Sequence, residues 1–220
     1  MPPANTTAHW LMSDIRNRVK DRFPTILVSL LSILQATAFS LLWAHDIDTI
    51  RLDAFSIDML ASLWQIAATV LLLIIIWMVY CVNIMRFVWL PTLLDSIFPF
   101  AIGLTEFMVI EYMNIDHLGW WLLFCALLNL LTAWSAQNTL VKARQDPGNA
   151  RYFANIQPAT WRNFIQDGLS IGAMAALAIY LIIRPGSQIA IWAALIFITA
   201  VIAIIFNNLS KYWRSAMSAD

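Results

Sequence analysis

Long apolar stretches, separated by short polar ones, dominate the pattern of this chain. Six of them reach the length of about 20 residues that an α-helix needs to cross a hydrocarbon core of ~30 Å. They cover residues 25–44, 59–82, 92–112, 118–137, 165–183 and 188–206. The pattern therefore predicts an all-α, polytopic transmembrane helix bundle of six spans in residues 24–220.

Residues 1–23 follow a different pattern, in which apolar residues recur at helical spacing and the basic residues lie largely on the remaining helical surface. The apolar residues that recur there at helical spacing are Trp10, Leu11, Ile15, Val19 and Phe23. This arrangement predicts a cytoplasmic, amphipathic, interfacial helix whose basic side chains lie near anionic lipid headgroups. An ordinary charged start to the first span is the alternative. A cleaved signal peptide fits less well, because the apolar run continues to Trp43 and cleavage would leave an odd number of spans.

The basic residues are unevenly distributed between the two sides of a six-span chain. Eleven Lys and Arg residues fall on the side that holds both termini and the segment 138–164, whereas Arg51 and Arg184 alone fall on the other side. Cytoplasmic loops of membrane proteins carry an excess of Lys and Arg. The asymmetry therefore predicts that both termini are cytoplasmic.

The composition agrees with a membrane protein and excludes a soluble globular domain, because 61% of the residues are hydrophobic and 12% are charged. Thirteen Lys and Arg balance thirteen Asp and Glu, so nothing favours binding to nucleic acid. The partner that we expect is the lipid bilayer, in the bacterial cytoplasmic (inner) membrane. Cys81 and Cys125 lie inside predicted spans without CxxC spacing, which leaves no disulfide framework and no thiolate metal site.

The predicted third span contains two acids, Asp95 and Glu106. A carboxylate near the middle of a membrane helix costs about 2.5–3.5 kcal/mol on insertion scales, so such residues usually face a bundle interior or a water-filled path. The two acids are eleven residues apart, and about 100° per residue places them on one face of the helix. They are the leading candidates for handling an ion or a proton.

The side of the membrane opposite the termini is expected to be acidic. Glu111 lies at the end of the third span, and the predicted external loops carry Asp46, Asp48, Asp53, Asp58 and Asp116. A vestibule that concentrates cations is one interpretation, which makes Glu111 a third candidate for ion or proton handling. A merely solvated polar loop is the other. A calcium loop of the EF-hand type is excluded, because Ile50 and Arg51 stand where a third ligand and a glycine are required.

The predicted fifth span carries small residues at intervals of four: Gly168, Gly172 and Ala176. Such a stripe allows another backbone to approach closely and is typical of helix packing in membranes. Its partner is either another helix of the same chain or a second copy of the protein, in which case the chain forms a homo-oligomer through this span.

No motif for hydrolysis, nucleotide binding or metal binding occurs in the sequence, and the three histidines lie outside the predicted spans. We therefore expect no cofactor and no metal, and favour a role other than that of an enzyme. Asp95 and Glu106 would lie about 16 Å apart along the helix, too far for an acid pair that shares one substrate bond.

Several short features occur in the middle and the end of the chain: Ile76-Trp77 in the second span, Trp89-Leu90 and then Phe98-Pro99-Phe100 around the third, and a final hairpin that turns at Pro185-Gly186. Their order resembles that of the prokaryotic relatives of the lysosomal potassium channel. The resemblance implies a six-span fold with cytoplasmic termini and a tetrameric or pseudo-tetrameric cation pore. The R-x-x-x-F-S-D signature that opens the first span of that family is absent here, since Ile26 follows Arg22 by four residues. No pore or selectivity residue can therefore be transferred.

These patterns favour an integral membrane protein that acts as a channel or transporter for a small cation, a proton or a small solute. The alternative is a non-transporting membrane subunit, assembly factor or sensor. In that case the two acids are neutral or paired with Gln65 or Asn129 and serve packing.

Overall fold

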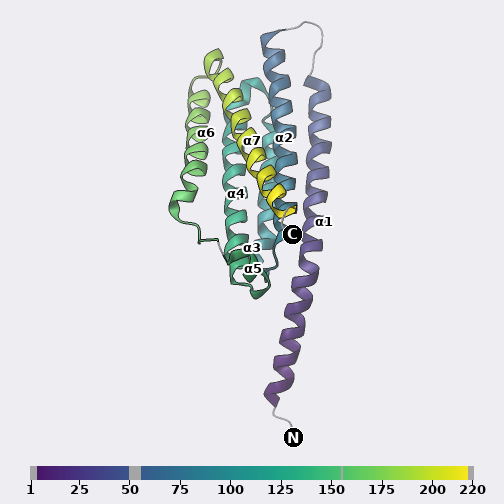
Figure 1. Cartoon of the computed structure of the whole chain (residues 1–220). Helices are drawn as coiled ribbons and strands as arrows, with labels where there is room; N and C mark the ends of the chain where they lie inside the picture. Colours follow the sequence, from purple (N-terminus) through teal and green to yellow (C-terminus); the bar gives the residue numbers. More distant parts are fainter. Residues whose placement is uncertain (1–3, 50–55, 155, 218–220) are drawn as a thin grey trace.

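The computed structural model describes residues 4–49, 56–154 and 156–217, and all regular secondary structure within these ranges is helical (Figure 1). Its long helices are α1 (Ala4–Thr49), α2 (Ile57–Arg86), α3 (Leu93–Glu111), α4 (Leu118–Gln145), α6 (Ile165–Ile183) and α7 (Gln188–Met217). Within the described residues, six helices are long and apolar enough to cross a membrane. This confirms the predicted all-α fold with six apolar spans. Arg51 and Asp53 lie outside the described residues.

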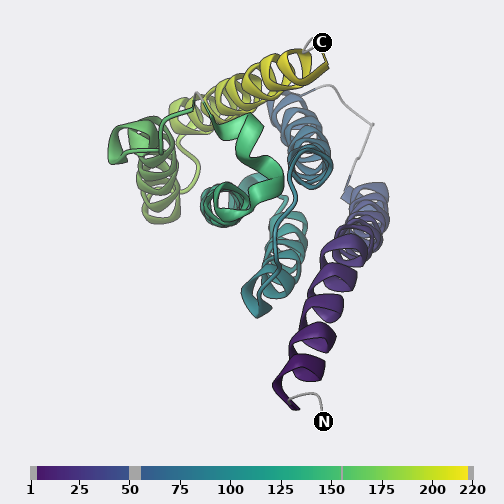
Figure 2. The same ribbon diagram turned by 60° about the horizontal axis from the view of Figure 1, so that its bottom comes forward.

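The six long helices form a closed ring, in which the neighbours follow the order α1, α2, α7, α6, α4, α3 and back to α1 (Figures 1 and 2). Two hydrogen bonds cross the ring between α2 and α4. Trp121 Nε1 donates to Thr69 Oγ1 at 3.1 Å, and the hydroxyl oxygens of Tyr80 and Ser135 lie 2.9 Å apart. The contact between α2 and α4 thus divides the ring into two halves that share these two helices.

The two halves bury different kinds of side chains. Helices α1, α2, α3 and α4, which form one half, carry the buried polar residues of the described spans: Gln35, Gln65, Thr69, Asp95, Thr105, Glu106, Ser135 and Thr139. Every buried side chain in the described parts of α6 and α7 is apolar, and a largely apolar cavity of about 30 Å³ lies between these helices, α2 and α4. We call the first the polar half and the second the apolar half.

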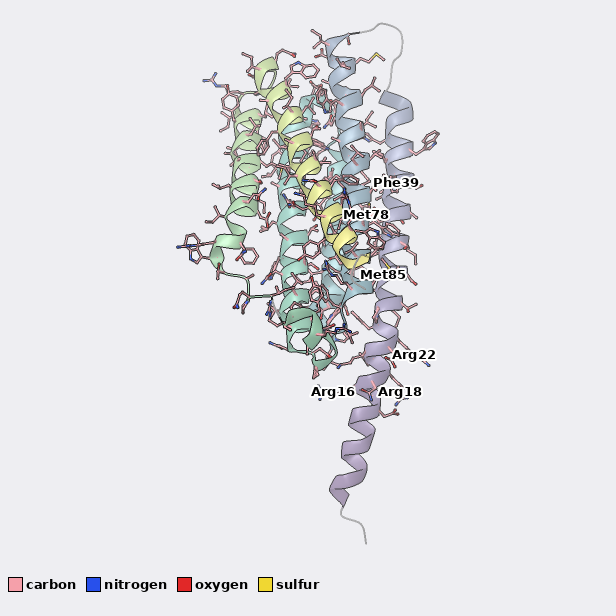
Figure 3. All side chains as sticks on the ribbon, in the orientation of Figure 1. Arg16, Arg18, Arg22, Phe39, Met78 and Met85 are labelled. Carbon is pink, nitrogen blue, oxygen red and sulfur yellow. The ribbon has the colours of Figure 1, made fainter. Side chains whose placement is uncertain are left out.

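Helix α1 is much longer than the predicted first span. It continues through Pro24 as one helix of 46 residues, about 69 Å at 1.5 Å per residue, which exceeds a hydrocarbon core of ~30 Å. Its amino-terminal part therefore extends beyond the other helices and carries Arg16, Arg18 and Arg22 (Figure 3). The amphipathic segment 1–23 is continuous with the span wherever the structure describes it, and its contact with lipid stays a prediction.

The other helix boundaries differ from the predicted ones mainly at the polar ends. Helix α6 coincides with the predicted span 165–183, whereas α4 and α7 continue beyond residues 137 and 206. Hydropathy marks the part of a helix that fits the hydrocarbon core, but the helix itself can continue into water. A tight turn connects α6 and α7, and Gly186 adopts a φ of +85° there, a conformation that a side chain disfavours.

Candidate functional site

Glu106 of α3 is completely buried in the polar half, with 0% of its surface exposed. Its Oε1 accepts a hydrogen bond from Gln35 Nε2 of α1 at 2.5 Å. Its Oε2 is also buried, and no described residue donates a hydrogen bond to it. None of the ion pairs between described residues includes Glu106. It is therefore a carboxyl group in the protein interior with one amide partner and no cation beside it.

Asp95 has very different surroundings, near the amino-terminal end of α3. Its Oδ2 accepts hydrogen bonds from the Thr92 backbone N at 2.6 Å and from Thr92 Oγ1 at 3.0 Å, which forms a capping box. From α4, Asn138 Nδ2 donates to Oδ1 at 2.9 Å, and Lys142 Nζ lies 2.8 Å and 2.7 Å from the two carboxylate oxygens. Asp95 is thus a charge-paired capping residue that joins α3 to α4.

Neither acid is paired with the residues that the sequence suggested. Glu106 contacts Gln35 in place of Gln65 or Asn129, and Asp95 contacts Lys142 and Asn138. Asn129 lines the cavity of the apolar half. These pairings depend on how each helix is rotated, which the apolar sequence of a membrane span does not reveal.

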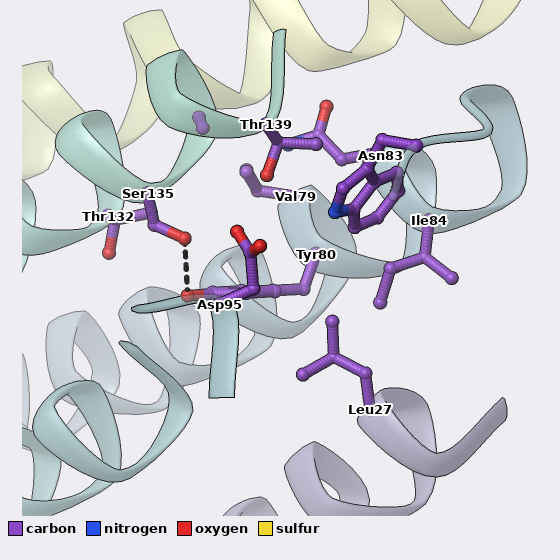
Figure 4. Close-up of a pocket in the computed structure, with 11 residues that line it drawn as sticks. Leu27, Val79, Tyr80, Asn83, Ile84, Asp95, Thr132, Ser135 and Thr139 are labelled. Carbon is purple, nitrogen blue, oxygen red and sulfur yellow. Dashed lines mark hydrogen bonds between the residues drawn. The ribbon is translucent and has the colours of Figure 1, made fainter. Parts of the chain in front are cut away.

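A small cavity of about 10 Å³ lies beside Asp95 in the polar half (Figure 4). Its polar lining comes from Tyr80, Asn83, Trp89, Asp95, Thr132, Ser135 and Thr139. Figure 4 shows the Asp95 carboxylate in the space that is bordered by the hydrogen-bonded hydroxyls of Tyr80 and Ser135.

The sequence patterns did not predict that α4 contributes side chains to this site. Thr132, Ser135, Thr139 and Lys142 follow one another at intervals of three, four and three residues, which places them on one face of the helix. The first three line the cavity, and Lys142 pairs with Asp95. Polar residues at helical spacing inside an apolar run are a usable signal, but the predicted span ended at residue 137 and so excluded Thr139 and Lys142.

Glu111 does not belong to this buried cluster. It is the last residue of α3 and is exposed, at the end of that helix opposite Asp95. Eleven residues of helix separate Glu106 from Asp95, whereas Glu111 follows Glu106 by five. A role of Glu111 in attracting cations to that end of the protein stays a prediction.

The stripe of Gly168, Gly172 and Ala176 is exposed on α6. A Cβ added at Gly168 or Gly172 would meet no other atom within 4 Å. Helix α6 packs against the rest of the chain through a different face, which buries Met174 and Ala178. In the described structure the stripe therefore packs against no helix of the same chain.

Outside the spans, the segment after α4 fastens several helix ends to one another. Asn149 Oδ1 accepts a hydrogen bond from the Val88 backbone N at 3.1 Å, and its Nδ2 donates to the carbonyls of Val88 and Ala143 at 2.5 Å and 2.7 Å. Asp146 pairs with Lys20 of α1. These contacts connect the ends of α2 and α4 with the part of α1 that carries Lys20.

Comparisons with known proteins do not indicate a function for this site. No known protein family matches the chain, and neither the curated proteins nor the solved structures include a match. No group of three or more His, Cys, Asp or Glu that could hold a metal ion occurs among the described residues. The resemblance to relatives of the lysosomal potassium channel stays a prediction, and the function has to be argued from the polar half.

Proposed function

We propose that this integral membrane protein transports protons, or exchanges protons for a small cation, through its polar half. Glu106 is the residue that takes up and releases the charge. The observation that carries the proposal is the surroundings of Glu106, a fully buried carboxyl group with Gln35 as its hydrogen-bond partner and one oxygen without a donor among the described residues.

The argument rests on the cost of an isolated charge. An ionised carboxylate inside a membrane protein is costly unless a cation or several hydrogen bonds accompany it. Asp95 has such partners in Lys142, Asn138 and Thr92, and so has the surroundings of a structural acid. Glu106 does not, and it can relieve the cost by carrying a proton or by meeting a mobile cation. A group that alternates between these two states is what proton-coupled transport requires.

The size of the cavity favours a proton over a hydrated ion. The space beside Asp95 measures about 10 Å³, which is room for about one water molecule. Hydroxyl groups of Tyr80, Ser135 and Thr139 line it. A proton can move between such oxygen atoms and single water molecules, whereas a hydrated metal ion needs a wider path. A cation pore of the kind that the resemblance implies would have to form between several copies of the chain.

A second candidate is a non-transporting membrane subunit, assembly factor or sensor. The observation that favours it is the outward stripe on α6, where Gly168 and Gly172 leave open space for another helix. We propose that this stripe binds a second copy of the chain, because close backbone contact is the usual means of helix association in membranes. Assembly through α6 is compatible with either function.

We also propose that both termini face the cytoplasm of a bacterial cell, in its inner membrane. The uneven distribution of Lys and Arg supports this orientation. In a variant that lacks Cys81 and Cys125, a cysteine placed at the exposed Gly148 should react with an impermeant reagent only from the cytoplasmic side. A cysteine at the exposed Asp116 is the matched probe of the opposite side. Labelling of both positions from the same side would contradict the topology.

Proton flux from purified protein in liposomes tests the proposed function. We expect the unmodified protein to dissipate a pH gradient, alone or with an added Na⁺ or K⁺ gradient, and Glu106→Gln to fold normally but lose this flux. Gln keeps the shape and the hydrogen bonding of Glu but cannot ionise. Asp116→Asn, which removes an exposed acid, is the matched control and should retain full flux.

Asp95→Asn supplies a second comparison on the same helix, since it keeps the cap but loses the charge pair with Lys142. Full flux in both Glu106→Gln and Asp95→Asn would contradict a path along these acids. No flux from the unmodified protein under any gradient would favour the non-transporting alternative.

A further inference from the structure

We infer that the cavity beside Asp95 is a binding site for one water molecule, held by the indole N–H of Trp89. The water connects the Asp95–Lys142 pair with the Tyr80–Ser135 pair. As a binding site this inference stands on geometry alone, whereas its use as a step of proton transfer rests on the proposed function.

The first observation is a buried donor without an acceptor. Trp89 is 5% exposed and lines the cavity, and its Nε1 is buried with no hydrogen-bond acceptor among the described residues. Buried polar groups in folded proteins almost always have a partner, either protein or ordered water. The indole therefore needs an acceptor that the described residues do not provide.

The indole is also held in place. Its neighbour Val88 is fixed through both its backbone N–H and its carbonyl by the side chain of Asn149. The segment between α2 and α3 is thus fastened to the end of α4, where Asn149 also donates to the Ala143 carbonyl at 2.7 Å. A backbone that is fixed on both sides limits the freedom of Trp89 to turn its N–H toward bulk water.

The size and the lining of the cavity fit one water molecule. A water site requires at least about 10–15 Å³ and two to four polar partners, and the volume here is about 10 Å³. The Trp89 N–H supplies a donor, and Asp95, Tyr80 and Ser135 supply oxygen atoms on the same cavity. Water can accept one hydrogen bond from the indole and donate two to these oxygens.

Charge argues against an ion in the same place. A cation would meet the positive edge of the Trp89 N–H, and Lys142 Nζ already lies within 2.8 Å of both Asp95 oxygens. An anion would meet the Asp95 carboxylate. The occupant must be small and neutral, and must both accept and donate hydrogen bonds, which is the chemistry of water.

The water site would complete a continuous series of hydrogen-bonding groups. It runs from Lys142, which is partly exposed, through Asp95 and the bound water to the Tyr80 and Ser135 hydroxyls. In a proton transporter this series would carry a proton from the Lys142 end of the bundle as far as the Tyr80 and Ser135 hydroxyls.

Nuclear magnetic resonance of the full chain in micelles tests the water site directly. With ¹⁵N-labelled tryptophan, Trp89→Phe identifies the Trp89 indole signal by its loss. We expect a cross-relaxation peak between that indole proton and water. Ala136→Val adds two methyl groups at a residue that lines the cavity, and this variant should remove the peak. The exposed Trp43, identified by Trp43→Phe, is the control whose contact with water should not change.

Absence of the water peak at Trp89 in the unmodified protein would overturn the inference. Persistence of the peak in Ala136→Val, with the other indole signals unmoved, would also overturn it, because the indole would then meet water elsewhere. If Ala136→Val fails to fold, Tyr80→Phe replaces it, since loss of one partner hydroxyl should weaken the peak. The readout is independent of flux, so a water peak with full flux in Glu106→Gln would reject the proposed function and leave the water site intact.

Discussion

Gln35 and Glu106 join α1 to α3 through one hydrogen bond, in which the amide Nε2 lies 2.5 Å from the carboxyl Oε1. The amide oxygen of Gln35 and the other carboxyl oxygen of Glu106 are buried, and neither has a donor among the described residues. This one hydrogen bond thus provides most of the hydrogen bonding of two buried side chains. The junction between α1 and α3 is therefore the place where a change in the charge of Glu106 acts first.

Replacement of Gln35 by Leu should destabilise the bundle. The change removes the donor to Glu106 and leaves both carboxyl oxygens without a partner among the described residues. We therefore expect the free energy of unfolding to fall by about 0.6–2 kcal/mol, the range for hydrogen bonds between membrane helices. Glu106→Gln should cost much less, because an amide at that position can still accept from Gln35. Unfolding in mixed detergent micelles measures both variants.

Thr37→Val is the matched control for this comparison. Thr37 lies on the same helix but is exposed, and its hydroxyl donates to the Ile33 carbonyl of its own helix. Replacement of Thr37 by Val should hardly change the free energy of unfolding. Equal stability of Gln35→Leu and Thr37→Val would show that the bond between Gln35 and Glu106 contributes nothing to folding.

The ion pair between Asp146 and Lys20 should make stability depend on acid pH. The hydrogen bond from Lys20 holds the pKa of Asp146 below its usual range, and the Gly148 backbone N–H acts in the same direction. Because the folded-state pKa is the lower one, the pair stabilises the fold above the unfolded-state pKa of about 3.9, and this contribution disappears as the pH falls through the lowered value.

Thermal unfolding of the unmodified protein and of Asp146→Asn checks this dependence. Asn keeps an acceptor for the Gly148 N–H but loses the charge, so Asp146→Asn should be less stable by at most about 1 kcal/mol for a pair near the surface. The difference should be constant between about pH 5 and 8, and it should disappear as the pH falls through the lowered pKa of Asp146. A difference that grows on acidification would contradict the assignment. Asp14→Asn is the control, since Asp14 forms a solvent-exposed pair with Arg18.

Two glycines should respond differently to an added side chain. At Gly119 of α4, a Cβ would lie 2.8 Å from the Ile182 backbone N and 3.0 Å from the Ala178 carbonyl of α6. Gly119→Ala should therefore force α4 and α6 apart and destabilise the fold by about 1–3 kcal/mol, the usual cost of overpacking. Gly172→Ala meets open space and should leave the stability unchanged. Similar melting temperatures for the two variants would contradict the packing of α4 on α6.

The outward stripe on α6 gives a separate prediction for assembly. Gly172→Leu should fold like the unmodified protein, because an added Cβ would meet nothing within 4 Å beyond its chain neighbours and the backbone of its own helix. If two copies associate through this stripe, the larger side chain should weaken the association, and native mass spectrometry should show more monomer. An unchanged mass distribution with intact folding would mean that the stripe faces lipid.

For the glycine stripe, the sequence predicted a packing surface but not the face of the helix that packs inside the chain. The spacing of Gly168, Gly172 and Ala176 indicated a packing surface on the fifth span, and the span itself coincides with α6. Which of the faces of α6 meets α4 could not be predicted, because α6 is almost wholly apolar after Ser170 and its side chains there are compatible with lipid or protein. The buried face is that of Met174 and Ala178.

The amino-acid sequence by itself determined that six helices can cross the membrane. A helix that crosses the hydrocarbon core needs about 20 consecutive apolar residues, and all its backbone groups must be hydrogen-bonded within the helix. The length requirement is visible in the composition of each segment. The tertiary structure alone decided that Glu106 meets Gln35, that Asp95 meets Lys142, and that Tyr80 lies on α2 opposite Ser135 of α4. These contacts depend on the order of the helices around the ring and on the rotation of each one. The apolar pattern of a membrane span does not encode that rotation, because lipid and protein interior favour the same side chains.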